Sequence, residues 1–322
     1  VSALQHAENL LCDLGEEVFA AEYMNAPLDA VGAQYNLTIE DVCGHVLNMP
    51  PLQLPPASTV FVGHCDVNRS NGGLHFCLAG FDQAMTGHSP AYGHYPDRGD
   101  LYPKNASEQI KQQGIFSGLK AVCDRIRDSV FTQGGKRVNP SVLLVDASFE
   151  SATVHRFCDW ARREHCYPFR VIAAIGRAAN KYRVHSAQLI GKAFEGGHYQ
   201  KAQTDEQKRY VMFNADYWRE VSQRAFLGDA GAAGQFTLWK PTHTRYHTAF
   251  AEQVTAEKLT NKYETPDGIR WEFNHAPGTA WDWGDALTGC WVAAAASGLS
   301  ASGTPQPPRK TRKPLEVRRV KV

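Results

Sequence analysis

The feature that most constrains the fold is a strand–helix–strand pattern between residues 140 and 175. Residues 140–146 form a short, continuous apolar run that ends in Asp146, as expected of a strand buried on both faces. Helical periodicity follows over 151–164, with Ser148 in position to cap the helix, and 169–175 is a second apolar run. This spacing predicts a βαβ unit and therefore a sheet that is parallel in part.

A β-hairpin is predicted upstream of that unit. Residues 58–67 and 74–81 are rich in β-branched and apolar side chains, and Asn71-Gly72 between them is a strong turn signal. Asp66 falls near the end of the first strand. We therefore predict an α/β fold, in which a mixed sheet contains a β-hairpin followed by a βαβ unit and is flanked by helices.

The composition indicates one large domain with appendages. The chain has 322 residues, of which 43% are hydrophobic, enough to bury a full core. We expect a helical segment and a Pro-rich linker over 1–55, the main domain over 56–299, and a disordered basic tail over 300–322. From Gly303 onward, seven Lys or Arg against one Glu give +6, so the net charge of +1 leaves −5 for the rest. Nucleic acid must therefore bind through a local basic patch.

Membrane, secreted and zinc-ribbon classes are disfavoured. No stretch approaches the roughly 18 consecutive apolar residues of a membrane span, and the first residues lack the order of a signal peptide. The eight cysteines include no C-x-x-C pair, which disfavours a zinc ribbon or a disulfide framework. We expect a cytoplasmic protein without a membrane partner.

Three acids stand where a site can be built. Asp66 and Asp146 lie at the ends of predicted strands, and Asp285 begins a predicted Ala-rich helix within 281–296. Sites in open α/β sheets favour the carboxyl ends of strands. Gathered carboxylates repel one another unless cations lie between them, and oxygen ligands suit Mg²⁺ or Mn²⁺. Taken singly, each acid is more often a helix cap, a turn residue or a residue favoured by the helix dipole than part of a site.

The order of these features resembles the nuclease portion of the large terminase subunits of tailed phages, in particular the lambda-like branch. The resemblance covers roughly residues 19–300. His-Cys-Asp-Val at 64–67 and Leu-Leu-Val-Asp-Ala-Ser at 143–148 resemble the two acidic strand motifs of that family. The remaining similar segments lie at 153–158, 213–220, 250–257 and 281–296.

The resemblance implies a ribonuclease H-like endonuclease that cuts double-stranded DNA during viral genome packaging in the host cytoplasm. In its two-metal mechanism Asp66 bridges two Mg²⁺ or Mn²⁺ ions, and Asp146 and Asp285 each hold one. Relatives often carry a Glu and then an Asp near the last motif. Here Thr288 follows Asp285, so Asp282 upstream is a further candidate ligand. The implied partners are double-stranded DNA, the small terminase, the portal and a packaging ATPase domain or subunit, since no G-x-x-x-x-G-K-[ST] motif occurs in this sequence.

Further candidates surround these acids. His64 precedes Asp66 by two residues and shares its face of the strand, and Glu150 follows Asp146 closely, so both are predicted auxiliary residues. Basic residues after the βαβ unit are predicted to contact the DNA backbone, namely Arg177, Lys181, Arg183 and Lys192. The plainer interpretations are a structural histidine, a solvated acid and a charged surface loop.

Two other functions stay open at this point. The first is another ribonuclease H-like nuclease, such as a junction resolvase or an integrase, which would prefer branched DNA. The second is a non-catalytic DNA-binding or assembly module that keeps the fold, and failure to bind Mn²⁺ would indicate it.

Overall fold

The computed structural model of the protein describes residues 37–68, 73–164, 166–182, 198–203, 209–243, 245–265, 268–275 and 277–299. The predicted turn at Asn71-Gly72, the first 36 residues and the basic tail lie outside these ranges. Within the described ranges, every helix is too short or too polar to cross a membrane.

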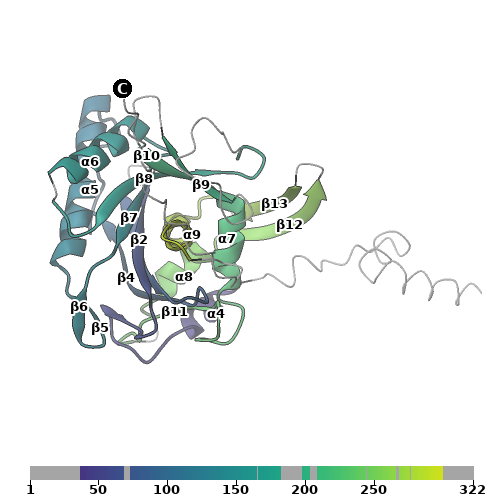
Figure 1. The fold of residues 1–322 in the computed structure, drawn as a ribbon. Coiled ribbons are helices and arrows are strands. Elements are labelled where there is room, and N and C mark those ends of the chain that lie inside the picture. The colour runs from purple at the N-terminus through teal and green to yellow at the C-terminus, as the bar shows by residue number, and fades with distance from the viewer. Residues whose placement is uncertain are drawn as a thin grey trace, which may run out of the picture.

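An eight-stranded mixed sheet forms the centre of the domain (Figure 1). Its strands are β2 (Val60–Val67), β3 (Leu74–Phe81), β4 (Gly87–Tyr95), β7 (Val142–Asp146), β8 (Arg170–Arg177), β9 (Tyr199–Gln203), β10 (Arg209–Asn214) and β11 (Phe236–Leu238). They lie in the order β11-β4-β3-β2-β7-β8-β10-β9. β3 is antiparallel to both β2 and β4, β9 is antiparallel to β10, and the other neighbouring pairs are parallel.

The predicted hairpin and βαβ unit are confirmed. β2 pairs with β3 in antiparallel fashion, and β7 and β8, joined through α6 (Ser151–Arg163), pair in parallel beside β2. In the central order β4-β3-β2-β7-β8, only β3 runs against the other four strands. This is the arrangement of a ribonuclease H-like fold, so the predicted fold class is confirmed.

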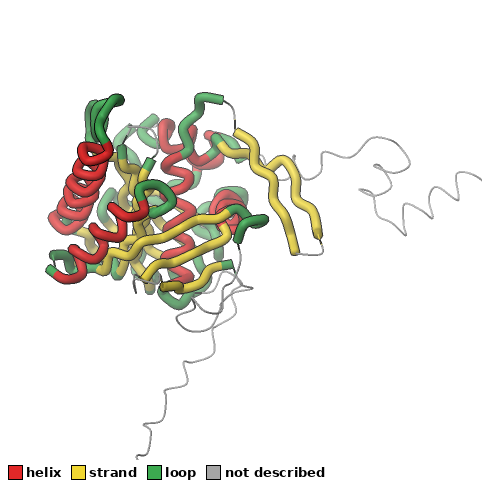
Figure 2. Tube along the Cα trace, turned by 90° about the horizontal axis from the view of Figure 1, so that it is seen from above, coloured by secondary structure: helices red, strands yellow, loops and turns green. Residues whose placement is uncertain are grey.

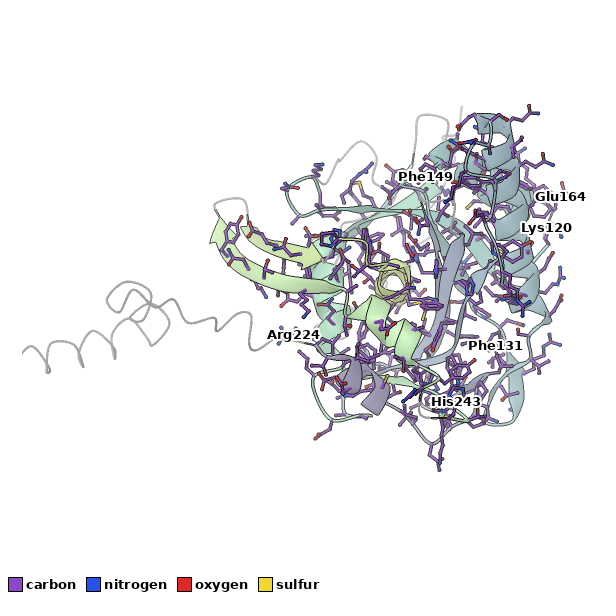
Figure 3. All side chains as sticks on the ribbon, turned by 180° about the vertical axis from the view of Figure 1, so that it is seen from behind. Lys120, Phe131, Phe149, Glu164, Arg224 and His243 are labelled. Atoms are coloured by element: carbon purple, nitrogen blue, oxygen red, sulfur yellow. The ribbon has the colours of Figure 1, made fainter. Side chains whose placement is uncertain are left out.

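Helices cover both faces of the sheet (Figures 1 and 2). One face packs on α5 (Glu108–Asp128) and α6, and the other packs on α9 (Asp282–Ala296), next to α7 (Ala215–Arg224) and α8 (Thr248–Val254). Alternate residues of each strand serve the two sides: Val62 and Leu144 belong to the cluster around α9, whereas Phe61 and Leu143 belong to the cluster under α5 and α6. Side chains therefore fill both sides of the sheet (Figure 3), which explains the continuous apolar runs of its central strands.

Helix α9 is apolar on all sides because it is enclosed. All ten residues from Ala286 to Ala295 are buried, and the helix packs on β2, β3 and β7. Gly289 lies against the ring of His64 in β2, and a Cβ atom at Gly289 would come within 2.0 Å of His64 Cγ. The close approach of α9 to β2 therefore requires glycine at this position.

The described residues ahead of position 55 pack on the same core. α4 (Ile39–Gly44) begins with a capping box formed by Thr38 and Asp41, and Val42 is buried in the cluster around α9. Leu54, in the predicted Pro-rich linker, is buried in β1 (Gln53–Leu54), which forms a small sheet with β5 (Phe131–Gln133) and β6 (Lys136–Val138). The core thus extends to the N-terminal side of the boundary that we predict at residue 55.

One local prediction is wrong. Ser148 does not cap α6, because the N-cap residue is Glu150, which has a left-handed backbone (φ 50°) and makes no side-chain cap bond. The N–H group of Ser148 instead donates to Asp146 Oδ1 at 3.1 Å. The turn that follows β7 is therefore organised around the acid at the strand end.

A separate two-stranded sheet projects from the body of the domain (Figure 2). It consists of β12 (Glu257–Thr265) and β13 (Gly268–His275), paired in antiparallel fashion. Its base contacts α7, so the two strands begin and end beside the helices that cover the sheet.

We expect Gly289→Ala to destabilise the protein, because the added methyl group must displace the buried ring of His64 or the helix itself. Overpacking of this kind costs about 1–3 kcal/mol, more than the gain of up to about 1 kcal/mol from alanine in a helix. Chemical denaturation measures the difference. Gly44→Ala is the matched control, since no atom lies within 4 Å of a Cβ there. If Gly289→Ala were equally destabilising in a His64→Ala background, the ring would not be the cause.

Candidate active site

Strand register places four polar side chains in one row across the sheet. Asp66 of β2 lies opposite His75 of β3, and His75 lies opposite His94 of β4. The parallel register of β2 with β7, continued by one residue, places Asp146 on the other side of Asp66. Directly opposed residues share a face of the sheet, so these four side chains point the same way.

The row faces the first turn of α9. Val62 and Leu144, which precede Asp66 and Asp146 by even numbers of residues, pack on the α9 side of the sheet. Asp282 and Asp285 both lie in the first turn of the helix, where the helix dipole favours negative charge. The site is therefore built from two strand ends and one helix start.

Helix α9 and strand β2 run in opposite directions, and one turn of the helix spans nearly the same length as two residues of the strand. Gly289 contacts His64, and Asp282, two turns nearer the helix start, accepts a hydrogen bond of 2.6 Å from Asn68 Nδ2. Four helical residues rise about 6 Å and two strand residues about 6.7 Å, so intermediate positions also face each other. Asp285 is thereby brought over Asp66.

Asp282 is held by neighbours on the other side as well. Its Oδ2 atom lies 3.7 Å from Nδ1 of His75, while Asn68 holds Oδ1. The His75 ring stacks on His94 at 5.7 Å and meets the edge of Trp283 at 5.1 Å. Burial, with a smaller contribution from His94, lowers the pKa of His75 to about 4, so this imidazole is neutral at physiological pH.

Asp66 is the most strongly perturbed acid of the row. It is only 8% exposed, and burial raises its pKa well above the ordinary value. The charges of Asp285, Asp146 and Asp282, in that order, raise the pKa further. The four carboxylates are thus close enough to repel one another.

Asp146 is perturbed in the same direction. Burial raises its pKa to about 6, and the charge of Asp285 adds to the effect, whereas hydrogen bonding to Ser148 and the charge of Arg177 oppose it. Asp285 therefore acts on both strand acids.

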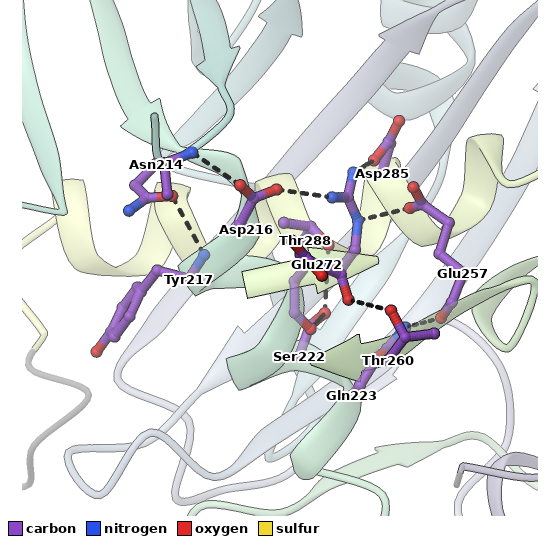
Figure 4. Close-up of polar contacts among 12 residues, drawn as sticks. Asn214, Asp216, Tyr217, Ser222, Gln223, Glu257, Thr260, Glu272, Asp285 and Thr288 are labelled. Carbon is purple, nitrogen blue, oxygen red and sulfur yellow. Dashed lines mark hydrogen bonds and ion pairs between the residues drawn. The ribbon is translucent and has the colours of Figure 1, made fainter. Parts of the chain in front are cut away.

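Asp285 is bound in turn by a buried arginine. Arg219 of α7 is 14% exposed and forms ion pairs with Asp285 Oδ1 (3.0 Å, from Nη2), Asp216 Oδ1 (3.4 Å, from Nη1) and Glu257 Oε2 (2.5 Å, from Nε). In Figure 4, dashed lines mark these ion pairs at the carboxylates of Asp216, Glu257 and Asp285. Asp216 also accepts a hydrogen bond of 2.7 Å from the N–H group of Ala179. Burial raises the pKa of Glu257 to about 7, although Arg219 opposes the shift.

Several residues of this site were not predicted from the sequence. His75 carries no local signal, because only its register with Asp66 brings it to the acids. Asp216, Arg219 and Glu257 lie within the segments 213–220 and 250–257, which resemble terminase nucleases, but the resemblance by itself gives these three residues no role. That resemblance was the signal available.

The predicted auxiliary residues lie at two different places. His64 is 2% exposed and packs against Gly289, and neither ring nitrogen has a hydrogen-bond partner among the residues that the structure describes. Burial lowers its pKa to about 3. Glu150 lies at the start of α6, where burial and then Glu108 of α5 raise its pKa. The structure thus places His64 in the core below the acids and Glu150 beside α5.

The predicted DNA-binding residues are described only in part. Arg177 ends β8, is exposed, and is close enough to Asp146 to lower the pKa of that acid. Lys181 follows on an exposed turn. Arg183 and Lys192 lie outside the described residues.

The acids of the site fit a divalent cation by their chemistry. All are carboxylates, their mutual repulsion raises pKa values, and oxygen donors are the ligands that Mg²⁺ and Mn²⁺ prefer. In the portion of the chain that the structure describes, no three His, Cys, Asp or Glu side chains are already arranged to hold a metal ion. Asp285 is turned to Arg219, and Asp282 to Asn68 and His75.

We expect Asp146→Asn to stabilise the metal-free protein at pH 7.5. The pKa of Asp146 rises from about 3.9 in an unfolded chain to about 6 in the folded protein, so the unfolded chain binds fewer protons between these values. The parent therefore loses stability as the pH rises through this window. The advantage of the variant should be on the order of 3 kcal/mol at pH 7.5 and vanish below about pH 4.

Denaturation in EDTA at several pH values measures this difference. The variant is compared with the parent at each pH, because the lowered pKa values of His64 and His75 act in the opposite direction. Asp229→Asn, at an exposed position, is the control. An Asp146→Asn protein no more stable than the parent at pH 7.5 would contradict the argument.

Comparison with known proteins gives one structural likeness. No protein-family model matches the chain, and no curated protein matches its sequence. The chain is similar to the solved structure of the nuclease domain of the large terminase subunit gp2 of bacterial virus Sf6. The two are 9% identical, the match covers 73% of this chain and 89% of that one, and the TM-score is 0.39.

Proposed function

We propose that this chain is a metal-dependent endonuclease that cuts double-stranded DNA during viral genome packaging. The observation that carries the nuclease proposal is the convergence of Asp66, Asp146 and Asp285 at the end of the sheet: the charges of Asp285 and Asp146 raise the pKa of Asp66, and the charge of Asp285 raises the pKa of Asp146. The packaging role rests on the ordered motifs that resemble large terminase subunits.

The acids have distinct proposed roles. Asp66 would be the acid shared by a pair of Mg²⁺ or Mn²⁺ ions, Asp146 and Asp285 would each hold one of them, and Asp282 would be an auxiliary ligand. Bound ions would supply a nucleophilic water and stabilise the leaving 3′-oxygen of the phosphodiester. The N–H group of Ser148 fixes the orientation of Asp146 through its 3.1 Å hydrogen bond.

The protein's own cations have a second role. Arg177, beside Asp146, and Lys181 on the adjoining turn contact the phosphate backbone of the DNA next to the acids. Arg183 and Lys192 are proposed to extend this contact. Because phosphate contacts carry no sequence information, we expect cleavage to tolerate different sequences.

The proposed setting follows from the same resemblance. The partners are double-stranded DNA, a packaging ATPase domain or subunit, the small terminase and the portal, and the reaction takes place in the host cytoplasm during virion assembly. The basic tail after residue 303 is proposed as an electrostatic tether to DNA or to the portal.

One observation favours a different function. Among the described residues no ready three-ligand metal group exists, as expected of a DNA-binding or assembly module that keeps the fold and lacks catalysis. Calorimetry with Mn²⁺ separates the two possibilities, because the nuclease must bind the ion at Asp66. Comparison of linear and branched DNA substrates separately tests a junction resolvase.

We expect Asp66→Asn to abolish plasmid nicking and linearisation in the presence of Mg²⁺ or Mn²⁺. The ions stabilise the transition state by several kcal/mol, so the loss should be on the order of 10³-fold or more. Folding and DNA binding should persist, because the amide is isosteric and removes a repelling charge. EDTA should inhibit the parent to the same extent.

Asp229→Asn serves as the control, since it removes one exposed carboxylate away from the row. Mn²⁺-dependent nicking by a folded Asp66→Asn protein would overturn the proposed mechanism.

A further inference from the structure

The buried guanidinium of Arg219 forms an ion pair with Asp285, the acid that the proposed mechanism needs for its second ion. Nη2 of Arg219 is 3.0 Å from Asp285 Oδ1, and the side chain is 14% exposed. Asp285 is also the acid whose charge raises the pKa of both Asp66 and Asp146. A fixed positive charge, shared with Asp216 and Glu257, is therefore already paired with one of the three acids.

Arg219 is anchored from several sides. Asp216, one turn earlier on α7, holds Nη1, and Glu257, at the start of β12, holds Nε. The guanidinium carbon also lies 5.2 Å from the centre of the Phe273 ring on β13. Because three elements hold it, Arg219 does not swing away from Asp285 without breaking several contacts.

We propose that Arg219 makes the two ion positions unequal: the Asp66–Asp146 position binds a divalent cation tightly in the free protein, and the Asp285 position binds one only weakly. This inference rests on the proposed function and assigns Arg219 the role of a positioning residue. A cation at Asp285 meets the repulsion of the guanidinium at short range and loses one oxygen of the carboxylate to it. A cation at Asp66 and Asp146 shares Asp146 Oδ1 with the Ser148 N–H group, and the positive charge it meets there is that of Arg177, which is exposed and therefore screened by solvent.

Because the two ion positions differ in affinity, binding of the second ion depends on bound DNA. A phosphodiester brings negative charge and additional oxygen ligands to the site, which offset the repulsion from Arg219. The Asp285 position then fills when DNA is in place. The substrate itself would thus complete the site, and the resting protein would hold an incomplete one.

The test is a titration of the full chain with Mn²⁺ in the absence of DNA. Electron paramagnetic resonance measures the concentration of the free ion at each point of the titration. The parent should show two classes of site whose dissociation constants differ by at least about tenfold. Asp285→Asn should remove the weak class alone. Arg219→Met should tighten the weak class by at least about tenfold and bring the two classes together.

The matched control is Arg224→Met. Arg224, labelled in Figure 3, belongs to the same helix, is 57% exposed and forms an ion pair with Glu220. The Arg224→Met substitution removes the same charge from α7 and should leave both classes of Mn²⁺ site unchanged. Arg219→Lys, which keeps the charge, should retain a weak class.

The parent protein alone can overturn the inference, because two equal sites would contradict it whether or not Arg219→Met folds. A folded Arg219→Met protein with an unchanged weak class would overturn it as well. Failure of the proposed function looks different: both classes would be present and unequal, and no plasmid would be cut. Cleavage by a protein with two equal sites would support the proposed function and contradict the role of Arg219.

Discussion

The contact between Gly289 and His64 is the constraint on which the site depends. It sets how closely α9 approaches β2 and how the helix is rotated about its axis. Asp285 lies one helical turn before Gly289 in α9, and Asp66 lies two residues after His64 in β2. The packing of Gly289 on His64 therefore brings these two acids together. The next matching step is the hydrogen bond between Asn68 and Asp282. Core packing and site geometry are thus one property of a single helix–strand pair.

This arrangement buries acids whose ionised forms prefer water. Strand alternation turns Asp66 and Asp146 toward the covered side of the sheet, where burial disfavours their ionised forms and their neighbours disfavour them further. The helix dipole, the Ser148 N–H group and Arg177 offset only part of that cost. Buried acids that repel one another are costly to stability, and such residues are retained where a function uses them.

Much of the frame was predictable from the sequence, because it depends on local pattern. The apolar runs and turn signals indicated the hairpin and the βαβ unit, and strand periodicity placed Asp66 and Asp146 at strand ends. His75 was not predictable, since its place beside Asp66 depends on a cross-strand register that no local pattern specifies. The left-handed residue Glu150 likewise displaced the expected Ser148 cap, because the Ser148 N–H group bonds to Asp146 instead.

The third acid shows where sequence reasoning loses precision. Asp282 and Asp285 are three residues apart on one helix, so periodicity places them on the same face and cannot choose between them. The two acids differ in partners that come from distant parts of the chain: Asn68 and His75 lie against Asp282, whereas Arg219 forms an ion pair with Asp285. Because Arg219 is itself held by Asp216 and Glu257, Asp285 lies where α9, α7 and the projecting β12–β13 sheet meet. Its charge therefore acts on both strand acids while its own environment is set by elements outside the sheet.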